Sequence, residues 1–125
     1  MTITATLEMR FKPDLLDEAK AVLVRVLAET RAFEGNLGVD VLVDLEDAGH
    51  WVANEIWESV EHDDAYRAFR AGEGRITDLG PLLAAAPVLT RWARSTGSDL
   101  LPTPGSGSAF PGPTAARSRP GSRTS

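Results

Sequence analysis

The chain has 125 residues, of which 42% are hydrophobic, a formal net charge of −5 and no cysteine. This length fits one domain or one small domain with a tail, and the acidic balance argues against a nucleic-acid partner. The lack of cysteine excludes disulfides, thiolate metal sites and cysteine nucleophiles. No apolar signal segment or membrane-spanning run is visible, so we expect a cytoplasmic protein without a membrane partner.

The beginning of the chain predicts a strand followed by a helix. Residues 2–11 alternate between apolar and polar side chains, which is typical of a strand with one face in the core. Pro13 and Asp14 stop this strand and open a helix, whose apolar residues keep a three-four spacing from Leu15 to Leu27. We expect the helix to end near Arg31–Phe33.

Two strands joined by an acidic hairpin loop come next. Gly35 can take the positive φ of a turn, and the second strand should bury Leu37, Val39, Val41 and Val43. The third strand, roughly His50 to Glu58, is apolar on both faces, which predicts that it is central in a layered domain or covered by a partner subunit. Its alternation puts Trp51, Ala53, Glu55 and Trp57 on one side and Val52, Asn54 and Ile56 on the other.

The remaining elements are a second helix, a short helix and a fourth strand. Ser59 is a good N-cap for a helix over about Val60–Ala71, with Ala65 and Phe69 facing inward and Asp63-Asp64 on a solvated face. A short helix is expected around Pro81, and Val88–Arg94 can form a strand. We predict one domain over residues 1–96, followed by a disordered tail over residues 97–125, which are rich in Gly, Pro and Ser.

The element order and several motifs resemble the antibiotic biosynthesis monooxygenase family. The order is that of a split βαβ, ferredoxin-like α+β fold. The motif residues are Thr30 followed by Glu34-Gly35-Asn36-Leu37, and then Glu55-Ile56-Trp57-Glu58-Ser59 with Glu61. The resemblance implies a homodimeric α/β barrel with one pocket in each subunit. It also implies cofactor-independent oxygenation of aromatic polyketides or quinols, or haem degradation.

Three positions depart from the family pattern. Asn36 stands where many members have cysteine, Tyr66 where many have histidine, and Ala53 where the polyketide oxygenases have asparagine. Asn54 is one residue along and should therefore point to the opposite side of the strand. No histidine occupies the axial position that the haem-degrading branch needs, which argues against haem degradation.

Oxygenation without a cofactor needs a substrate that donates its own electrons to oxygen, in an apolar pocket that holds a phenolate. The catalytic candidates are Glu55, as a proton acceptor, and Tyr66, as a hydroxyl donor. The substrate-binding candidates are Trp57, Trp51 and Asn54. All but Asn54 also have a structural interpretation: the tryptophans and Tyr66 as core residues, and Glu55 as the ion-pair partner of an arginine such as Arg91 or Arg94.

Together with these residues, the resemblance implies a homodimeric monooxygenase that acts on a small aromatic, quinol or polyketide-type substrate and uses no cofactor and no metal. His50 and His62 are expected to be exposed polar residues, and two histidines without a carboxylate at ligand spacing predict no metal site. The alternatives are a non-catalytic, dimeric aromatic-binding or accessory domain and an isomerase or cyclase on the same scaffold.

Overall fold

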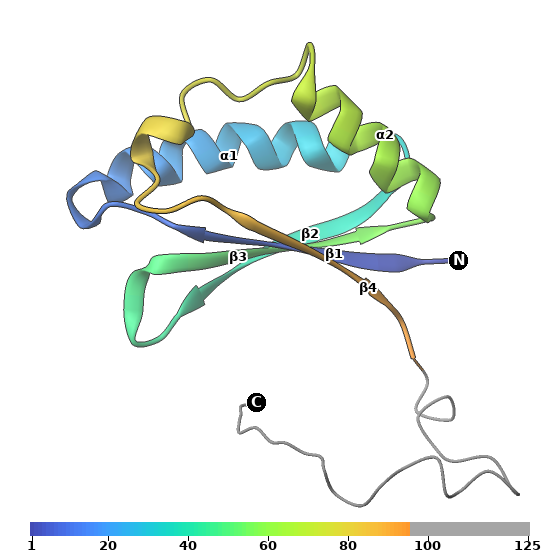
Figure 1. The fold of residues 1–125 in the computed structure, drawn as a ribbon, viewed down its shortest axis with the longest axis horizontal. Coiled ribbons are helices and arrows are strands. Elements are labelled where there is room, and N and C mark those ends of the chain that lie inside the picture. The colour runs from blue at the N-terminus through green and yellow to red at the C-terminus, as the bar shows by residue number, and fades with distance from the viewer. Residues whose placement is uncertain (96–125) are drawn as a thin grey trace, which may run out of the picture. The chain divides into compact units, whose positions relative to one another are not determined.

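The structure, a computed structural model, describes residues 1–95, which form an antiparallel four-stranded sheet and two α-helices (Figure 1). The predicted tail lies outside the described residues. Sheet order is β2-β3-β1-β4, which confirms the ferredoxin-like α+β prediction. In chain order the elements are β1 (Ile3–Arg10), η1 (Pro13–Leu15), α1 (Leu16–Ala32), β2 (Asn36–Asp44), β3 (Asp47–Trp57), α2 (Val60–Ala71), η2 (Gly80–Leu82) and β4 (Val88–Ala93).

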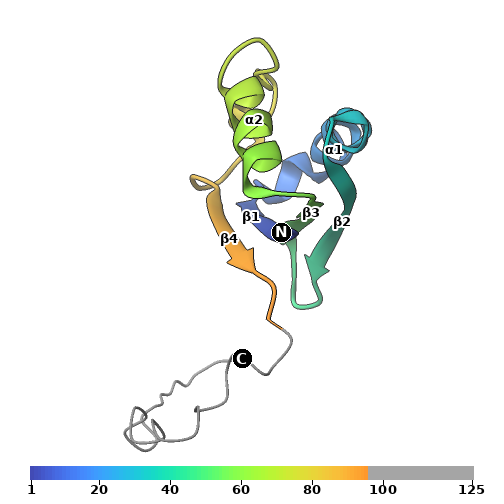
Figure 2. The same cartoon turned by 90° about the vertical axis from the view of Figure 1, so that its right-hand side faces the viewer.

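Both helices cover the same face of the sheet (Figure 2). Alternate residues of β3 are buried beneath them, namely Trp51, Ala53, Glu55 and Trp57. The intervening residues Val52, Asn54 and Ile56 are partly exposed on the other face. The predicted division of β3 into two faces is therefore observed. None of the helices in residues 1–95 is long and apolar enough to cross a membrane.

The space between sheet and helices holds two apolar clusters at successive levels along the strands. The clusters follow the register, because Met9 pairs with Trp51 on β3 and Ile3 pairs with Trp57. We call the first the Met9 cluster; its buried members are Met9, Phe11, Ala19, Val22, Leu23, Val26, Trp51, Ala53 and Leu82. We call the second the Trp57 cluster; it comprises Ile3, Ala5, Trp57 and Tyr66, with Phe33, Val60 and Phe69 packed against it.

The turn after α1 and the start of α2 fit against each other. Gly35 has a φ of 89°, in the left-handed region that glycine tolerates, and a Cβ atom there would collide with the ring of His62. Ser59 caps α2, since its hydroxyl accepts a hydrogen bond from the His62 backbone N–H at 3.1 Å. Both the predicted turn and the predicted cap are confirmed.

Two local predictions were wrong, and a third element is shorter than expected. In β2 only Val39 is fully buried, because a register shift between Asn36 and Gly38 interrupts the alternation and leaves Leu37 exposed. In α2 Asp63 is buried and Ala65 is exposed, contrary to prediction, whereas Phe69 packs against the Trp57 cluster as predicted. The short helix expected around Pro81 is present as a 3₁₀ helix of three residues, Gly80–Leu82.

The face of the sheet away from the helices carries exposed apolar side chains. Leu42 of β2 is 57% exposed, and Val88 and Trp92 of β4 are each 54% exposed. Leu42 lies opposite Val52 of β3 in the register, and Trp92 donates its indole N–H to Thr6 of β1 at 2.9 Å. We call this surface, formed by all four strands, the open sheet face.

His50 lies on the open sheet face between two carboxylates. Its Nδ1 is 2.9 Å from Asp44 and its Nε2 is 2.5 Å from Glu8. Hydrogen bonds to Asp44 and then to Glu8 raise the pKa of His50 above its usual value. The imidazole is thus part of a surface ion-pair network, where the sequence predicted an exposed polar residue.

Candidate functional site

A cavity of about 120 Å³ lies between the sheet and the two helices, where the Met9 and Trp57 clusters meet. Strands β1 and β3 form its floor, and α1, α2 and the segment after α2 form its walls. Its lining residues are Leu7, Met9, Leu23, Val26, Leu27, Thr30, Ala53, Glu55, Tyr66, Arg67, Arg70, Ile76 and Leu79. Glu55 and Tyr66, the two predicted catalytic residues, both line this cavity.

Glu55 is a buried carboxylate held by two donors. The Trp57 indole N–H donates to its Oε1 at 3.1 Å, and Arg67 forms a salt bridge with the same oxygen. The ion pair proposed from sequence therefore exists, but the partner is Arg67 of α2 and not Arg91 or Arg94 of the fourth strand. A carboxylate fixed at one oxygen keeps a defined orientation beside the cavity.

The hydroxyl of Tyr66 takes part in a chain of hydrogen bonds with a definite direction. Thr30 donates to the Val26 carbonyl at 2.9 Å, so its single hydroxyl hydrogen is used there. Tyr66 must then be the donor in its 2.6 Å bond to Thr30, and its oxygen accepts from Arg70 Nε at 2.8 Å. Tyr66 consequently fixes the position of Arg70 and gives its own hydrogen to Thr30.

Asp63 connects the cavity wall to the edge strand β4. Its side chain is fully buried and accepts from Arg67 Nε at 3.0 Å and from Arg91 at 3.1 Å. Arg91 also donates to the exposed Asp64 at 2.6 Å. Arg67, which holds Glu55, is thus itself held by a buried carboxylate.

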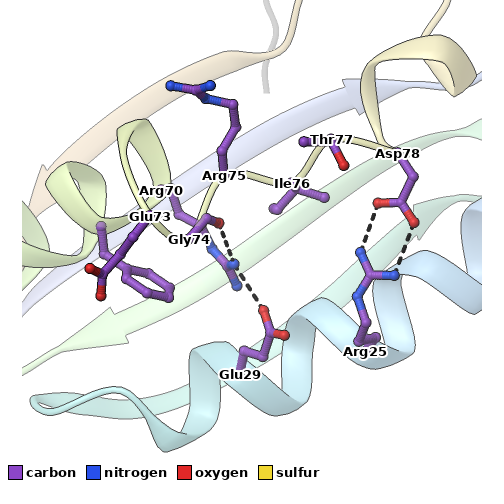
Figure 3. Close-up of a pocket in the computed structure, with 10 residues that line it drawn as sticks. Arg25, Glu29, Arg70, Glu73, Gly74, Arg75, Ile76, Thr77 and Asp78 are labelled. Carbon is purple, nitrogen blue, oxygen red and sulfur yellow. Dashed lines mark hydrogen bonds and ion pairs between the residues drawn. The ribbon is translucent and has the colours of Figure 1, made fainter.

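An outer cleft of about 400 Å³ lies next to the cavity, between α1 and the segment that follows α2 (Figure 3). Arg25 of α1 bonds both oxygens of Asp78, at 2.9 and 2.7 Å, and these bonds lower the pKa of the Asp78 carboxyl. Arg70 bonds Glu29 at 2.9 Å on the same side. Arg70 and Ile76 line both the outer cleft and the cavity, so they form the wall between the two spaces.

The other three predicted site residues lie outside the cavity lining. Trp57 is completely buried; its ring packs on Tyr66 at a centroid distance of 4.9 Å and its N–H orients Glu55. Trp51 packs on Phe11 and donates to the Ala48 carbonyl. Asn54 lies on the open sheet face, as strand alternation predicted. The substrate-binding roles of these three residues remain predictions.

Sequence reasoning missed the cationic part of the site. Arg67 and Arg70 both line the cavity, and their guanidinium carbons lie 5.0 and 5.1 Å from the centroid of the Tyr66 ring. One signal was present in the sequence, because Asp63 and Arg67 have the i,i+4 spacing of a helical ion pair. In residues 1–95 no group of three or more His, Cys, Asp or Glu side chains is arranged to hold a metal ion.

The sheet order, the helices on one face and the cavity between the layers define a ferredoxin-like α+β domain with an internal cavity. The family model described as antibiotic biosynthesis monooxygenase matches residues 2–74, and the chain belongs to this family. No curated protein matches the sequence.

Several solved structures share the fold. Rv0793 from Mycobacterium tuberculosis is 21% identical with a TM-score of 0.66, over 76% of this chain and 96% of that one. A conserved protein from Methanosarcina mazei is 17% identical with a TM-score of 0.69, over 76% and 94%. SnoaB from Streptomyces nogalater, a cofactor-independent oxygenase, is 18% identical with a TM-score of 0.65, over 76% and 95%.

Proposed function

We propose that this protein is a cofactor-independent monooxygenase that oxidises a small aromatic compound in the internal cavity. The observation that carries the proposal is the buried Glu55 carboxylate, oriented by Trp57 and Arg67 at the wall of a mostly apolar cavity. Membership of the monooxygenase family and the fold shared with a cofactor-independent oxygenase support it.

The reaction can be balanced without a further reductant. A phenol and O₂ give a quinone and water: one oxygen atom replaces a ring hydrogen as a carbonyl, and the other leaves as water. The substrate supplies all four electrons that O₂ takes up. The protein therefore has to promote loss of the phenolic proton, stabilise the phenolate and exclude bulk water.

The residues at the cavity fit these three tasks. Glu55 accepts the phenolic proton and returns it to the departing water. Arg67 and Arg70 supply positive charge for the phenolate oxygen, and Tyr66 keeps Arg70 in place. The indole of Trp57 keeps Glu55 oriented from beneath.

The test is oxygen uptake by purified protein, with and without a chelator, over a panel of phenols, quinols and anthrones. We expect uptake that survives the chelator and falls on the order of 10²-fold or more in Glu55→Gln. Glu58→Gln is the matched control, since Glu58 is exposed and directly follows the same strand. Uptake that needs a metal, or that Glu55→Gln leaves unchanged, would count against the proposal.

A second candidate function is binding of an aromatic molecule without turnover. It is favoured by one observation, namely that Glu55 and Tyr66 are already engaged by protein partners. Saturable ligand binding without oxygen uptake would identify this function. Product formed under strictly anaerobic conditions would instead identify an isomerase or cyclase.

We also propose that the open sheet face is covered by a second copy of the chain, which makes a homodimer. Exposed Leu42, Val88 and Trp92 cannot be buried by the helices of their own subunit, because these cover the opposite face. Sedimentation should show a dimer that Val52→Lys, at the centre of this face, converts to a monomer. Val24→Lys, on the exposed side of α1, should leave the dimer intact.

A further inference from the structure

The cavity is divided into a polar end and an apolar end. All eight apolar lining residues belong to, or pack against, the Met9 cluster: Leu7, Met9, Leu23, Val26, Leu27, Ala53, Ile76 and Leu79. The five polar lining residues are Thr30, Glu55, Tyr66, Arg67 and Arg70. Thr30 and Arg70 also bond the backbone carbonyl of Val26, so the two ends of the cavity meet at Val26.

The polar residues form one connected group around Tyr66. Thr30 and Arg70 bond its hydroxyl, Arg67 stacks over its ring, and Glu55 is paired with Arg67. The sheet register gives the direction of the division, since Glu55 pairs with Ala5 of the Trp57 cluster and Ala53 pairs with Leu7 beside the Met9 cluster. The cavity thus changes from polar to apolar along the strands.

The volume limits what can enter. An apolar cavity of about 150 Å³ holds one benzene molecule, so a volume of about 120 Å³ is on the scale of at most one small ring. A polar substituent at the apolar end would lose its hydrogen bonds to water without finding a partner, which is costly. Oxygen substituents are therefore tolerated only on the edge of the ring that faces the Tyr66 group.

From the volume and the division we propose that the cavity selects a single aromatic ring whose oxygen substituents lie together on one edge, as in phenol or catechol. A ring with oxygens at opposite ends, such as hydroquinone, is disfavoured, as are the fused rings of polyketides. The inference rests on the proposed function, because it takes the cavity as the place where the substrate binds. It deepens that function by naming the substrate class.

The test is calorimetric titration of the whole protein under anaerobic conditions, so that binding is measured without turnover. The ligands are phenol, catechol, hydroquinone and 2,3-dihydroxynaphthalene. We expect phenol and catechol to bind, hydroquinone to bind at least about tenfold more weakly, and the naphthalene diol to give no saturable heat. Equal affinity for hydroquinone and catechol, tight binding of the naphthalene diol, or no binding by any ring would overturn the inference.

A size variant adds a matched comparison. Leu23→Ala enlarges the apolar end and should bind 2,3-dihydroxynaphthalene with a saturable heat that the wild-type protein lacks. Leu82→Ala removes the same atoms from the Met9 cluster at a residue that does not line the cavity, and should gain nothing. If both variants bind the diol alike, the cavity does not set the size limit of the ligand. If Leu23→Ala fails to fold, the ligand series on the wild-type protein still tests the inference.

Oxygen uptake with the same ligands separates this inference from the proposed function. Selective binding of catechol without uptake would leave the inference standing and refute the oxygenase. Uptake with hydroquinone or an anthrone but not with catechol would support the oxygenase and overturn the inference.

Discussion

The change Asp63→Asn should destabilise the domain far more than its conservative chemistry suggests. Asp63 is 0% exposed and lies between two guanidinium groups, with Arg67 Nε at 3.0 Å and Arg91 Nη1 at 3.1 Å. An asparagine can offer its oxygen to one arginine, but its NH₂ group then faces the other, donor against donor. Removing one partner from a buried ion pair costs about 3–5 kcal/mol.

We expect a loss of about 3 kcal/mol for Asp63→Asn, because the asparagine oxygen keeps one of the two interactions. The whole free energy of unfolding of a domain of this size is roughly 5–15 kcal/mol, so the loss is large. With a typical urea dependence of about 1–3 kcal/mol per M, the unfolding midpoint should fall by about 1–3 M. Tryptophan fluorescence can follow the transition, since Trp51 and Trp57 are both buried.

The matched control is Asp64→Asn, at the neighbouring position. Asp64 bonds the same Arg91 at 2.6 Å, but its side chain is 59% exposed, so its removal should cost at most about 1 kcal/mol. If the two variants unfold at the same urea concentration, the buried carboxylate contributes no more than the surface one. The assignment of Asp63 as the residue that holds Arg67 would then be refuted.

Three further changes have expected outcomes of their own. The carboxylates of Asp44 and Glu8 raise the pKa of His50, so protonated His50 stabilises the folded state. This stabilisation is fully present below the ordinary histidine pKa and is lost as pH rises through the raised pKa. His50→Gln should therefore lower the urea unfolding midpoint more at pH 6 than at pH 9. Gly35→Ala should destabilise the protein by about 1–3 kcal/mol, whereas Gly38→Ala, with open space around it, should cost less than about 1 kcal/mol in the same thermal or urea titration. Asp78→Asn removes the charge and one of the two hydrogen bonds to Arg25, and should speed amide hydrogen exchange over residues 72–79 while leaving exchange in β1 unchanged.

The fold followed from local patterns because those patterns are strong in this chain. Alternation over residues 2–11 and over β3 predicted both strands and their buried faces, and the Ser59 cap predicted the start of α2. The wrong prediction that Leu37 is buried has a physical cause, since one extra residue in β2 shifts the alternation. The side-chain pattern of β2 does not indicate this shift.

The site was only partly predictable. Alternation tells which face of a strand a side chain lies on, but not which buried side chains of that face border the cavity. Glu55 and Trp57 were correctly placed on one face, but only Glu55 borders the cavity, since the Trp57 ring fills the core below α2. Asp63 was assigned to solvent because a charged residue on a short helix is usually exposed. Its second partner, Arg91, lies on a strand 28 residues away, and no local pattern reports such a pair.

The ion pairs of Asp63 and Glu55 bear on how any loss of activity should be interpreted. Arg91 on β4 holds Asp63, Asp63 holds Arg67, and Arg67 holds Glu55 at the cavity. A substitution at Asp63 can therefore lower activity without touching a substrate, by releasing Arg67. Such a positioning effect should lower activity in proportion to the loss of order at Arg67. Asp63→Glu keeps the carboxylate and should therefore retain part of the activity that Asp63→Asn loses. If Glu55 is the proton acceptor, as we propose, Glu55→Gln should instead lower kcat in a protein that still binds its ligand, because the amide keeps the shape of the side chain at the cavity.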